Sequence, residues 1–326
     1  MKNRRSVLLS IALFSCLVGI SWAPCSGGRA FPLQGDSSSK KPKRGSARPV
    51  TVPVGIKVRG TKPEELQLLD LNVTEDGETQ SMLSIRSVYT NSPMAIAILI
   101  QDDLVSSASL EIKALREFIT KSPKGSRVMI GYIRSGSLEV RQKFTTDLEK
   151  AASALRAPLG LASAAPFNPY VEVLEGLSRF DSQPAGRRSM LVVSDGLDTS
   201  RGIDSSSPGQ SLDLQRTINQ AQRRSVAVYS FYVPSVGLTS SNNQFLIGNG
   251  QSSLERLSTE TGGRAFFQGT GAPVSFNPFL SELRAALDRQ IALTYLSTHA
   301  NKGFHRLQIR SLTAGVELTY PAGYTR

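Results

Sequence analysis

The sequence predicts an α/β fold whose main part is a doubly wound, mostly parallel sheet, flanked in the chain by antiparallel strands. Strand-like and helix-like segments alternate from Met94 to Ala292, which is the pattern of a parallel sheet joined by crossover helices. Two strand-like segments in this region, MAIAILI and RSMLVVS, are largely apolar, as expected for strands covered on both faces. Before residue 90 and after residue 292, strand-like segments follow one another without helices, which indicates antiparallel pairing.

The first strands are expected after a change in composition at Pro49. The segment VTVPVGIKV, residues 50–58, has an alternating pattern and predicts a strand. In residues 66–89, LQLLDLNVTEDGETQSMLSIRSVY, short strands are expected around a turn at Asp76-Gly77, because Asp-Gly is a favoured hairpin dipeptide. We place this N-terminal β segment at residues 49–92.

The alternating region is placed at residues 93–292. Its helices have apolar residues at helical spacing, and Asn168 followed by Pro169 forms a typical helix start. Helices are expected at residues 106–122, 146–159, 168–180, 212–225, 251–263 and 276–292. Strands are expected at residues 94–100, 127–133, 188–194, 226–233 and 264–267. The polar residues 234–250 are expected to form the longest internal loop.

The C-terminal segment, residues 293–326, is expected to contain strands only. Its segments LTYLST, FHRLQIRSL and GVELTYPAGY carry the β-branched and aromatic residues that favour strands. Because no helix separates them, they and residues 49–92 predict a separate antiparallel element.

The N-terminus has the features of an export signal. Basic residues 2–5 precede an apolar run at residues 6–23, and small residues at Gly28 and Ala30 favour cleavage after Ala30. An uncleaved anchor is the alternative, because a run of about 18 residues is near the lower limit for a membrane span. We therefore predict a signal peptide at residues 1–30 and an exported protein that is periplasmic, at the bacterial cell surface or secreted.

The net charge of +12 is concentrated near the N-terminus. Residues 1–48 contain nine Lys or Arg and one Asp, a net charge of +8, which leaves +4 for the other 278 residues. We therefore expect residues 31–48 to be a basic flexible linker, and we expect no nucleic-acid partner. Only the leader or this linker would contact a membrane. Both cysteines precede residue 31, so a cleaved chain would have no disulfide.

The sequence lacks the motifs of the common enzyme classes. Its two histidines, His299 and His305, lie in hairpin-like strands near the C-terminus, and no G-x-S-x-G occurs. There is no H-E-x-x-H, no phosphate-binding loop and no G-x-G-x-x-G after a strand. A phosphotransfer aspartate in QDDLV would need partners that the sequence does not offer. We therefore expect no enzymatic activity.

Acidic and hydroxyl side chains follow two of the predicted parallel strands. Asp102 and Asp103 come directly after AIAILIQ, Ser106 and Ser107 follow them, and Asp195 comes directly after RSMLVVS. Ligands of such sheets bind at the carboxyl ends of the strands, where these side chains are expected to meet. Oxygen atoms are the ligands that Mg²⁺ prefers, so a metal site is predicted at this edge.

Three segments, in this order, resemble the ligand loops of a von Willebrand factor type A (VWFA) domain: AIAILIQDDLVSS, FNPYVEVLEGL and SMLVVSDGLDTS. The flanking segments LNVTEDGETQSMLSI, LERLSTETGGRAFF, LTYLST and VELTYPAGY are similar to the VWFA-related domain family described from acidobacteria. The resemblance covers about residues 50–326. It implies a Rossmann-like VWFA fold and a metal-ion-dependent adhesion site for Mg²⁺.

The chain departs from the D-x-S-x-S ligand pattern of that family. In the register that starts at Asp102, Leu104 takes the first serine position and Ser106 the second. In the register that starts at Asp103, Val105 takes the first serine position, so neither register restores the motif. Loss of a coordinating hydroxyl is expected to weaken metal binding by about 10–100-fold or more.

The resemblance therefore implies a degenerate site. Asn168 stands where the family has a threonine, and capping its own helix is its simpler role. The candidate metal ligands are Asp102, Ser106, Asn168 and Asp195. The candidate binding residues around them are Asp103, Ser107 and Asp198. Mg²⁺ is a possible cofactor, and no other is expected.

Two functions fit this sequence. The first is an exported, non-catalytic VWFA-like module that binds a protein partner near the degenerate site. The alternative is a structural or assembly component of the cell envelope, with no metal-gated ligand.

Overall fold

A computed structural model describes the chain at residues 47–58, 70–86, 93–241 and 243–326. The predicted signal peptide and almost all of the predicted linker lie outside these ranges, as do parts of the N-terminal β segment. Within them, no helix combines the length and apolar character needed to cross a membrane. The predicted domain boundaries stay predictions.

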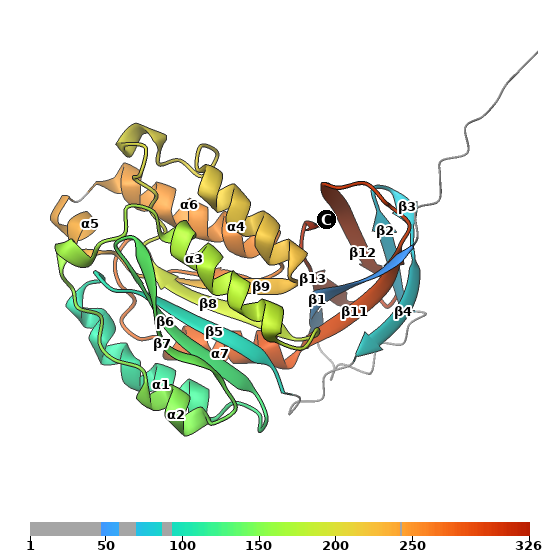
Figure 1. The fold of residues 1–326 in the computed structure, drawn as a ribbon, viewed down its shortest axis with the longest axis horizontal. Coiled ribbons are helices and arrows are strands. Elements are labelled where there is room, and N and C mark those ends of the chain that lie inside the picture. Colours follow the sequence, from blue (N-terminus) through green and yellow to red (C-terminus); the bar gives the residue numbers. More distant parts are fainter. Residues whose placement is uncertain (1–46, 59–69, 87–92, 242) are drawn as a thin grey trace, which may run out of the picture. The chain divides into compact units, whose positions relative to one another are not determined.

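Six strands form the central sheet: β5 (Ala95–Gln101), β6 (Arg127–Arg134), β7 (Ser137–Thr145), β8 (Arg188–Ser194), β9 (Val226–Tyr232) and β10 (Ala265–Phe266). Their order is β10-β9-β8-β5-β6-β7 (Figure 1). All neighbours pair in parallel except β6 and β7. The predicted doubly wound, mostly parallel sheet is confirmed.

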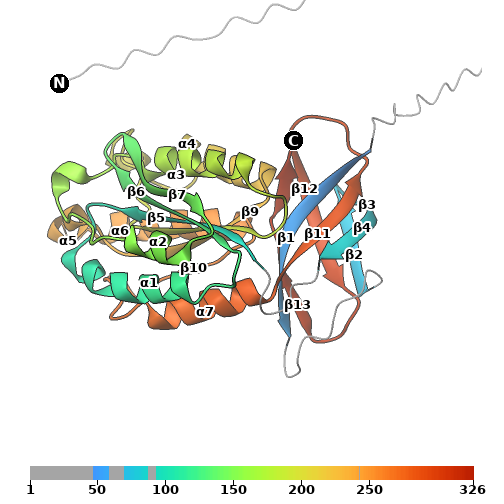
Figure 2. The same ribbon diagram turned by 60° about the horizontal axis from the view of Figure 1, so that its bottom comes forward.

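Helices cover both faces of this sheet (Figures 1 and 2). One face carries α1 (Ile112–Thr120), α2 (Leu148–Ser153) and α7 (Asn277–Asp288), and the other carries α3 (Pro169–Ser178), α4 (Leu212–Arg223) and α6 (Gln244–Glu260). In β5, Ile96, Ile98 and Ile100 belong to the first core, whereas Ala97 and Leu99 belong to the second. Successive β5 side chains therefore point to opposite faces.

Two segments differ from the sequence prediction. The strand β7 was not predicted, because at the sheet edge only alternate residues, Leu138, Val140 and Phe144, pack on the core, and they give no continuous apolar run. Residues 234–250, predicted as a loop, instead contain α5 (Val236–Ser241) and the start of α6. Asn243 caps α6 by accepting hydrogen bonds from the backbone N–H groups of Phe245 and Leu246. Burial of Leu246 and Ile247 then outweighs the weak helix propensity of the surrounding Gly, Ser and Asn residues.

The flanking segments together form two four-stranded sheets, with orders β13-β1-β11-β4 and β14-β12-β2-β3. The strands are β1 (Arg48–Val58), β2 (Leu71–Glu75), β3 (Glu78–Thr79), β4 (Ser81–Arg86), β11 (Gln290–Ser297), β12 (Phe304–Ser311), β13 (Val316–Thr319) and β14 (Gly323–Thr325). All their pairs are antiparallel, as predicted. One apolar core joins the sheets, including Val52, Leu293 and Ile309. The predicted turn at Asp76-Gly77 is also confirmed, with φ values of 51° and 86°.

Replacing Leu99 with alanine is expected to lower the free energy of unfolding by about 2–5 kcal/mol. Leu99 lies in the central strand with 0% exposure, so the lost side chain leaves a cavity that its neighbours cannot fill. The control is Leu110→Ala, at a residue that is 78% exposed, which should change stability by less than about 0.5 kcal/mol. Urea denaturation measures both, and equal effects would contradict the assignment of Leu99 to the core.

Candidate functional site

The carboxyl ends of β5 and β8 lie side by side, as predicted. Ile100 pairs in register with Val193, so Asp102 and Asp195 each follow one of two adjacent strand ends. Both aspartates are buried. Their carboxylates nevertheless have different partners.

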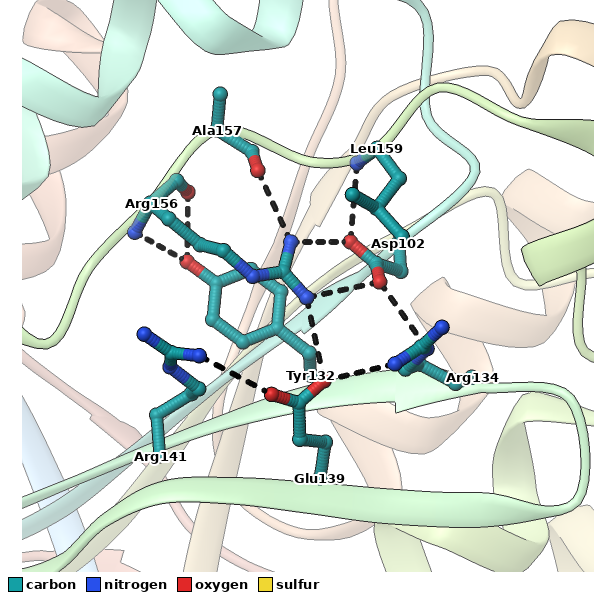
Figure 3. A network of polar contacts seen from close by, with 8 residues as sticks. All are labelled: Asp102, Tyr132, Arg134, Glu139, Arg141, Arg156, Ala157 and Leu159. Carbon is teal, nitrogen blue, oxygen red and sulfur yellow. Dashed lines mark hydrogen bonds and ion pairs between the residues drawn. The ribbon is translucent and has the colours of Figure 1, made fainter.

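Asp102 is held by two arginines (Figure 3). Arg156 Nη1 donates to Asp102 Oδ1 at 2.6 Å and Arg156 Nη2 donates to Oδ2 at 2.9 Å, which is a bidentate pair. Arg134 Nε lies 3.3 Å from Asp102 Oδ2. The backbone N–H of Leu159 donates to Oδ1 at 3.0 Å. Both carboxylate oxygens of Asp102 therefore already have cationic partners.

Contacts beyond Asp102 fix Arg156 in place. Its guanidinium carbon lies 3.9 Å from the centre of the Tyr132 ring, and the Tyr132 hydroxyl donates to the Arg156 carbonyl at 2.6 Å. The hydrogen bond to Asp102 raises the pKa of Arg156. Partial burial acts to raise the pKa of Glu139, but hydrogen bonds from Arg134 and Arg141 and the charge of Arg156 lower it. These contacts join Asp102, Glu139 and the arginines into one internal network (Figure 3).

The alternation of β5 explains why Asp102 faces the arginines. Ile98 and Ile100 point toward α1, α2 and α7, and Asp102 continues this series toward Arg156, which follows α2. Gln101 belongs to the other series, with Leu99. Gln101 was not predicted as a site residue, although the two-residue period of a strand places it on the same face as Leu99 and Asp103.

Gln101 joins the two strand ends on the side away from Asp102. Its Oε1 accepts hydrogen bonds from Ser194 Oγ at 2.5 Å and from the backbone N–H of Asp195 at 3.2 Å. Its Nε2 donates to Asp103 Oδ1 at 2.8 Å. Burial, and then the negative charge of Asp195, raises the pKa of Asp103 to about 6. Burial also raises the pKa of Asp195.

The segment after β9 covers these two carboxylates. Ser235 forms an antiparallel bridge with Leu104, and the backbone N–H of Val236 donates to the Asp103 carbonyl at 3.0 Å. The Ser235 side chain also hydrogen-bonds Asp195. As a result Asp103 is only 2% exposed and Asp195 only 4%.

The other predicted site residues have local structural roles or are exposed. Asn168 caps α3 by accepting from the backbone N–H of Tyr170 at 3.0 Å, and its amide donates to Asp213 at 2.8 Å. Asp198 accepts hydrogen bonds from the hydroxyls of Ser200 at 2.7 Å and Ser211 at 2.5 Å. The exposed residues Ser106 and Ser107 begin a short 3₁₀ helix.

In this arrangement the predicted ligands do not fit an octahedral Mg²⁺ shell. The oxygens of Asp102 are bound by guanidinium groups, the buried Leu104 offers no oxygen, and Asn168 uses its amide oxygen as a helix cap. The candidate metal ligands and binding residues stay predictions of the sequence, and this geometry gives most of them another role. The arginines were also missed, because Arg156 is distant from Asp102 in the sequence and belongs to no motif.

Comparisons with known proteins give weak similarities in fold. No family model and no curated protein matches the chain. An aerotolerance-related membrane protein from Bacteroides fragilis is similar at 10% identity and a TM-score of 0.42, over 60% of this chain and 98% of that one. BatB from Bacteroides thetaiotaomicron gives the same identity and TM-score, over 60% and 97%. The SpRpn10 VWA domain is similar at 12% identity and a TM-score of 0.33, over 50% of this chain and 85% of that domain. The proposals below therefore rest on the residues of this chain.

Replacing Arg156 with methionine is expected to lower the free energy of unfolding by about 3–5 kcal/mol, because it leaves the buried Asp102 carboxylate without its bidentate partner. Arg141→Met is the matched control, since Arg141 contacts only the half-buried Glu139 at 3.4 Å in this network and should contribute less than about 1 kcal/mol. Adding Asp102→Asn to Arg156→Met should restore part of the loss. Urea denaturation of all variants tests this, and equal losses for the two arginine variants would contradict it.

Asp103→Asn is expected to stabilise the protein in a pH-dependent way. The pKa of Asp103 is about 6 in the folded protein against 3.8 for an ordinary Asp, so between these values the folded state binds more protons. The unfolding free energy of the wild type therefore falls as pH rises from about 4 to about 6. The variant has no carboxylate at this position and does not show this fall. The difference in unfolding free energy should grow to the order of 3 kcal/mol and then stay constant. A difference that is the same at pH values near 4 and near 7 would rule this out.

Proposed function

We propose that the chain is an exported, non-catalytic VWFA-like module that binds a protein partner through the loop between α2 and α3, without a metal ion in the contact. The observation that carries this proposal is a group of exposed apolar side chains on that loop. Leu159, Leu161 and Phe167 are 44%, 54% and 71% exposed. Single exposed apolar residues are ordinary, but three within residues 159–167 of one connection favour a contact surface.

Hydrogen bonds to the sheet edge fix the loop that carries these side chains. The backbone N–H of Gly160 donates to the Asp102 carbonyl and that of Leu159 to the Asp102 carboxylate, both at 3.0 Å. The backbone N–H of Thr199 donates to the Phe167 carbonyl at 2.8 Å. A loop that is already ordered loses little conformational entropy when a partner binds. In this proposal Asp102 and its arginines thus shape the contact surface.

The burial of Asp103 and Asp195 favours a role without catalysis. Raised carboxylate pKa values also occur at acid–base catalytic sites. Here, however, Ser235 and Val236 lie over both carboxylates, so a substrate could not reach them without displacing this segment. His305 lies in β12 and His299 between β11 and β12, in the antiparallel part.

The alternative is a structural or assembly component of the cell envelope with no metal-gated ligand. The pairing of Asp102 with Arg156 favours it, because an internal cation then takes the place that an exchangeable ion would have. Both functions are independent of metal. They differ in whether a partner binds the loop between α2 and α3.

Immobilised protein incubated with envelope extract of its own cells tests the proposal. We expect the same captured partner with and without Mg²⁺ in the buffer, and at least about 10-fold weaker capture by Phe167→Asp, which corresponds to about 1.4 kcal/mol. Leu312→Asp is the matched control, because Leu312 is 70% exposed but follows β12.

Three outcomes would contradict the proposal. Capture that requires Mg²⁺ would indicate a metal-gated contact. Equal losses for Phe167→Asp and Leu312→Asp would indicate a general effect of the added charge. Capture unaffected by Phe167→Asp would place the contact elsewhere and favour the structural alternative.

A further inference from the structure

Both histidines of the chain meet a buried glutamate in the antiparallel part. Glu75 ends β2, His305 lies in β12, and His299 lies in the connection between β11 and β12. The Nδ1 atoms of His299 and His305 each lie 3.8 Å from Glu75 Oε1. One ligand atom from each of the three side chains lies within 4.8 Å of the other two. This cluster is separate from the carboxyl edge of the central sheet.

Two atoms in this cluster are buried without a hydrogen-bond partner among the described residues: Glu75 Oε2 and His299 Nδ1. Glu75 is 0% exposed, and its other oxygen accepts a hydrogen bond from Ser297 Oγ at 3.0 Å. Burial, and then the charge of Glu75 and a hydrogen bond to it, raises the pKa of the adjacent Tyr295, so its neutral hydroxyl is a donor available to the Glu75 carboxylate. A buried carboxylate is costly unless a cation compensates it. His299 Nδ1 is thus a buried ligand atom without a partner beside a buried carboxylate, which points to a missing cation.

The hydrogen bonds of His305 orient it as a metal ligand. Its Nε2 lies 3.0 Å from the Asn301 carbonyl, which can only accept, so Nε2 carries a proton. This leaves Nδ1, which faces Asp76 Oδ2 at 2.8 Å, as the atom that can bind a metal. A metal ion would replace the proton that Nδ1 shares with Asp76, and binding would release that proton.

We propose that Glu75, His299 and His305 bind one divalent transition-metal ion, with Zn²⁺ as the expected ion and the fourth coordination position open to water. Zinc bonds of about 2.0–2.2 Å to nitrogen and oxygen place tetrahedral ligands about 3.4 Å apart. The two distances of 3.8 Å from Glu75 reach this value with small side-chain shifts. A carbonyl oxygen on the far nitrogen of a histidine ligand, as at His305, is the usual supporting contact in zinc sites.

The nitrogen ligands distinguish this site from a magnesium site. Mg²⁺ prefers oxygen atoms, whereas imidazole suits Zn²⁺ and its transition-metal neighbours. An ion can enter from solvent, because the side chains of Asp76 and Glu78 are 37% and 72% exposed. The bound ion would connect β2 and β12 of one sheet to the end of β11 in the other. It would therefore stabilise the fold, in addition to any function of the loop between α2 and α3.

Untagged, chelator-treated protein tests this proposal, which does not rest on the proposed function. We expect Zn²⁺ to raise the melting temperature, with one ion bound per chain by metal analysis, whereas Mg²⁺ at the same concentration has little effect. Co²⁺ added in place of Zn²⁺ should give the visible absorption of a tetrahedral site, a readout that needs no variant.

Two variants locate the ion. His299→Ala, at a partly exposed position, should weaken Zn²⁺ binding by at least about 10-fold. Asp195→Asn should leave Zn²⁺ binding unchanged, because Asp195 belongs to the carboxyl edge. Absence of bound Zn²⁺ in the wild type, or equal binding by wild type and His299→Ala, would overturn the proposal. Loss of binding only in Asp195→Asn would also overturn it and place the ion at the carboxyl edge.

Discussion

The buried negative charge of Asp102 is the constraint on which the carboxyl edge of the sheet depends. A carboxylate without solvent needs compensating charge, and here it has the guanidinium groups of Arg156 and Arg134 and one backbone N–H. To supply them, the chain after α2 must cross the end of β5 before it enters α3. The position of the exposed apolar loop is thus a consequence of how this one charge is neutralised.

Sequence patterns predicted the sheet because burial on both faces leaves a continuous apolar run, as in β5 and β8. They failed where tertiary contacts decide the local structure. The strand β7 lies at the sheet edge and has no continuous apolar run, because only Leu138, Val140 and Phe144 pack on the core. The helix α6 begins among weak helix formers because Asn243 caps it and its apolar residues are buried. Local propensity carries no information about such contacts.

At the candidate site, the sequence predicted which strand ends meet but not which side chains face each other. One residue along β5 separates Gln101, which contacts Asp195, from Asp102, which contacts Arg156. That difference follows from the period of a strand, which can be counted in advance. The pairing of Arg156 with Asp102 cannot be predicted in this way, since it depends on a loop of irregular structure. Likewise, His305 lies in a strand as predicted, whereas His299 lies in the connection after β11, and the approach of both to Glu75 depends on the pairing of β2 with β12.

The two antiparallel sheets combine strands from the N-terminal and C-terminal segments, so they can be completed only late in synthesis. Arg48 in β1 pairs with Ser297 in β11, and β2 pairs with β3 on one side and with β12 on the other, so β1 and the second edge of β2 have no native neighbour until the last part of the chain has been made. Such distant pairings form slowly. In a chain that emerges N-terminus first, β1 and β2 would expose unpaired backbone groups while the central sheet already folds. These early strands are where a chaperone would bind the nascent chain and where aggregation would begin.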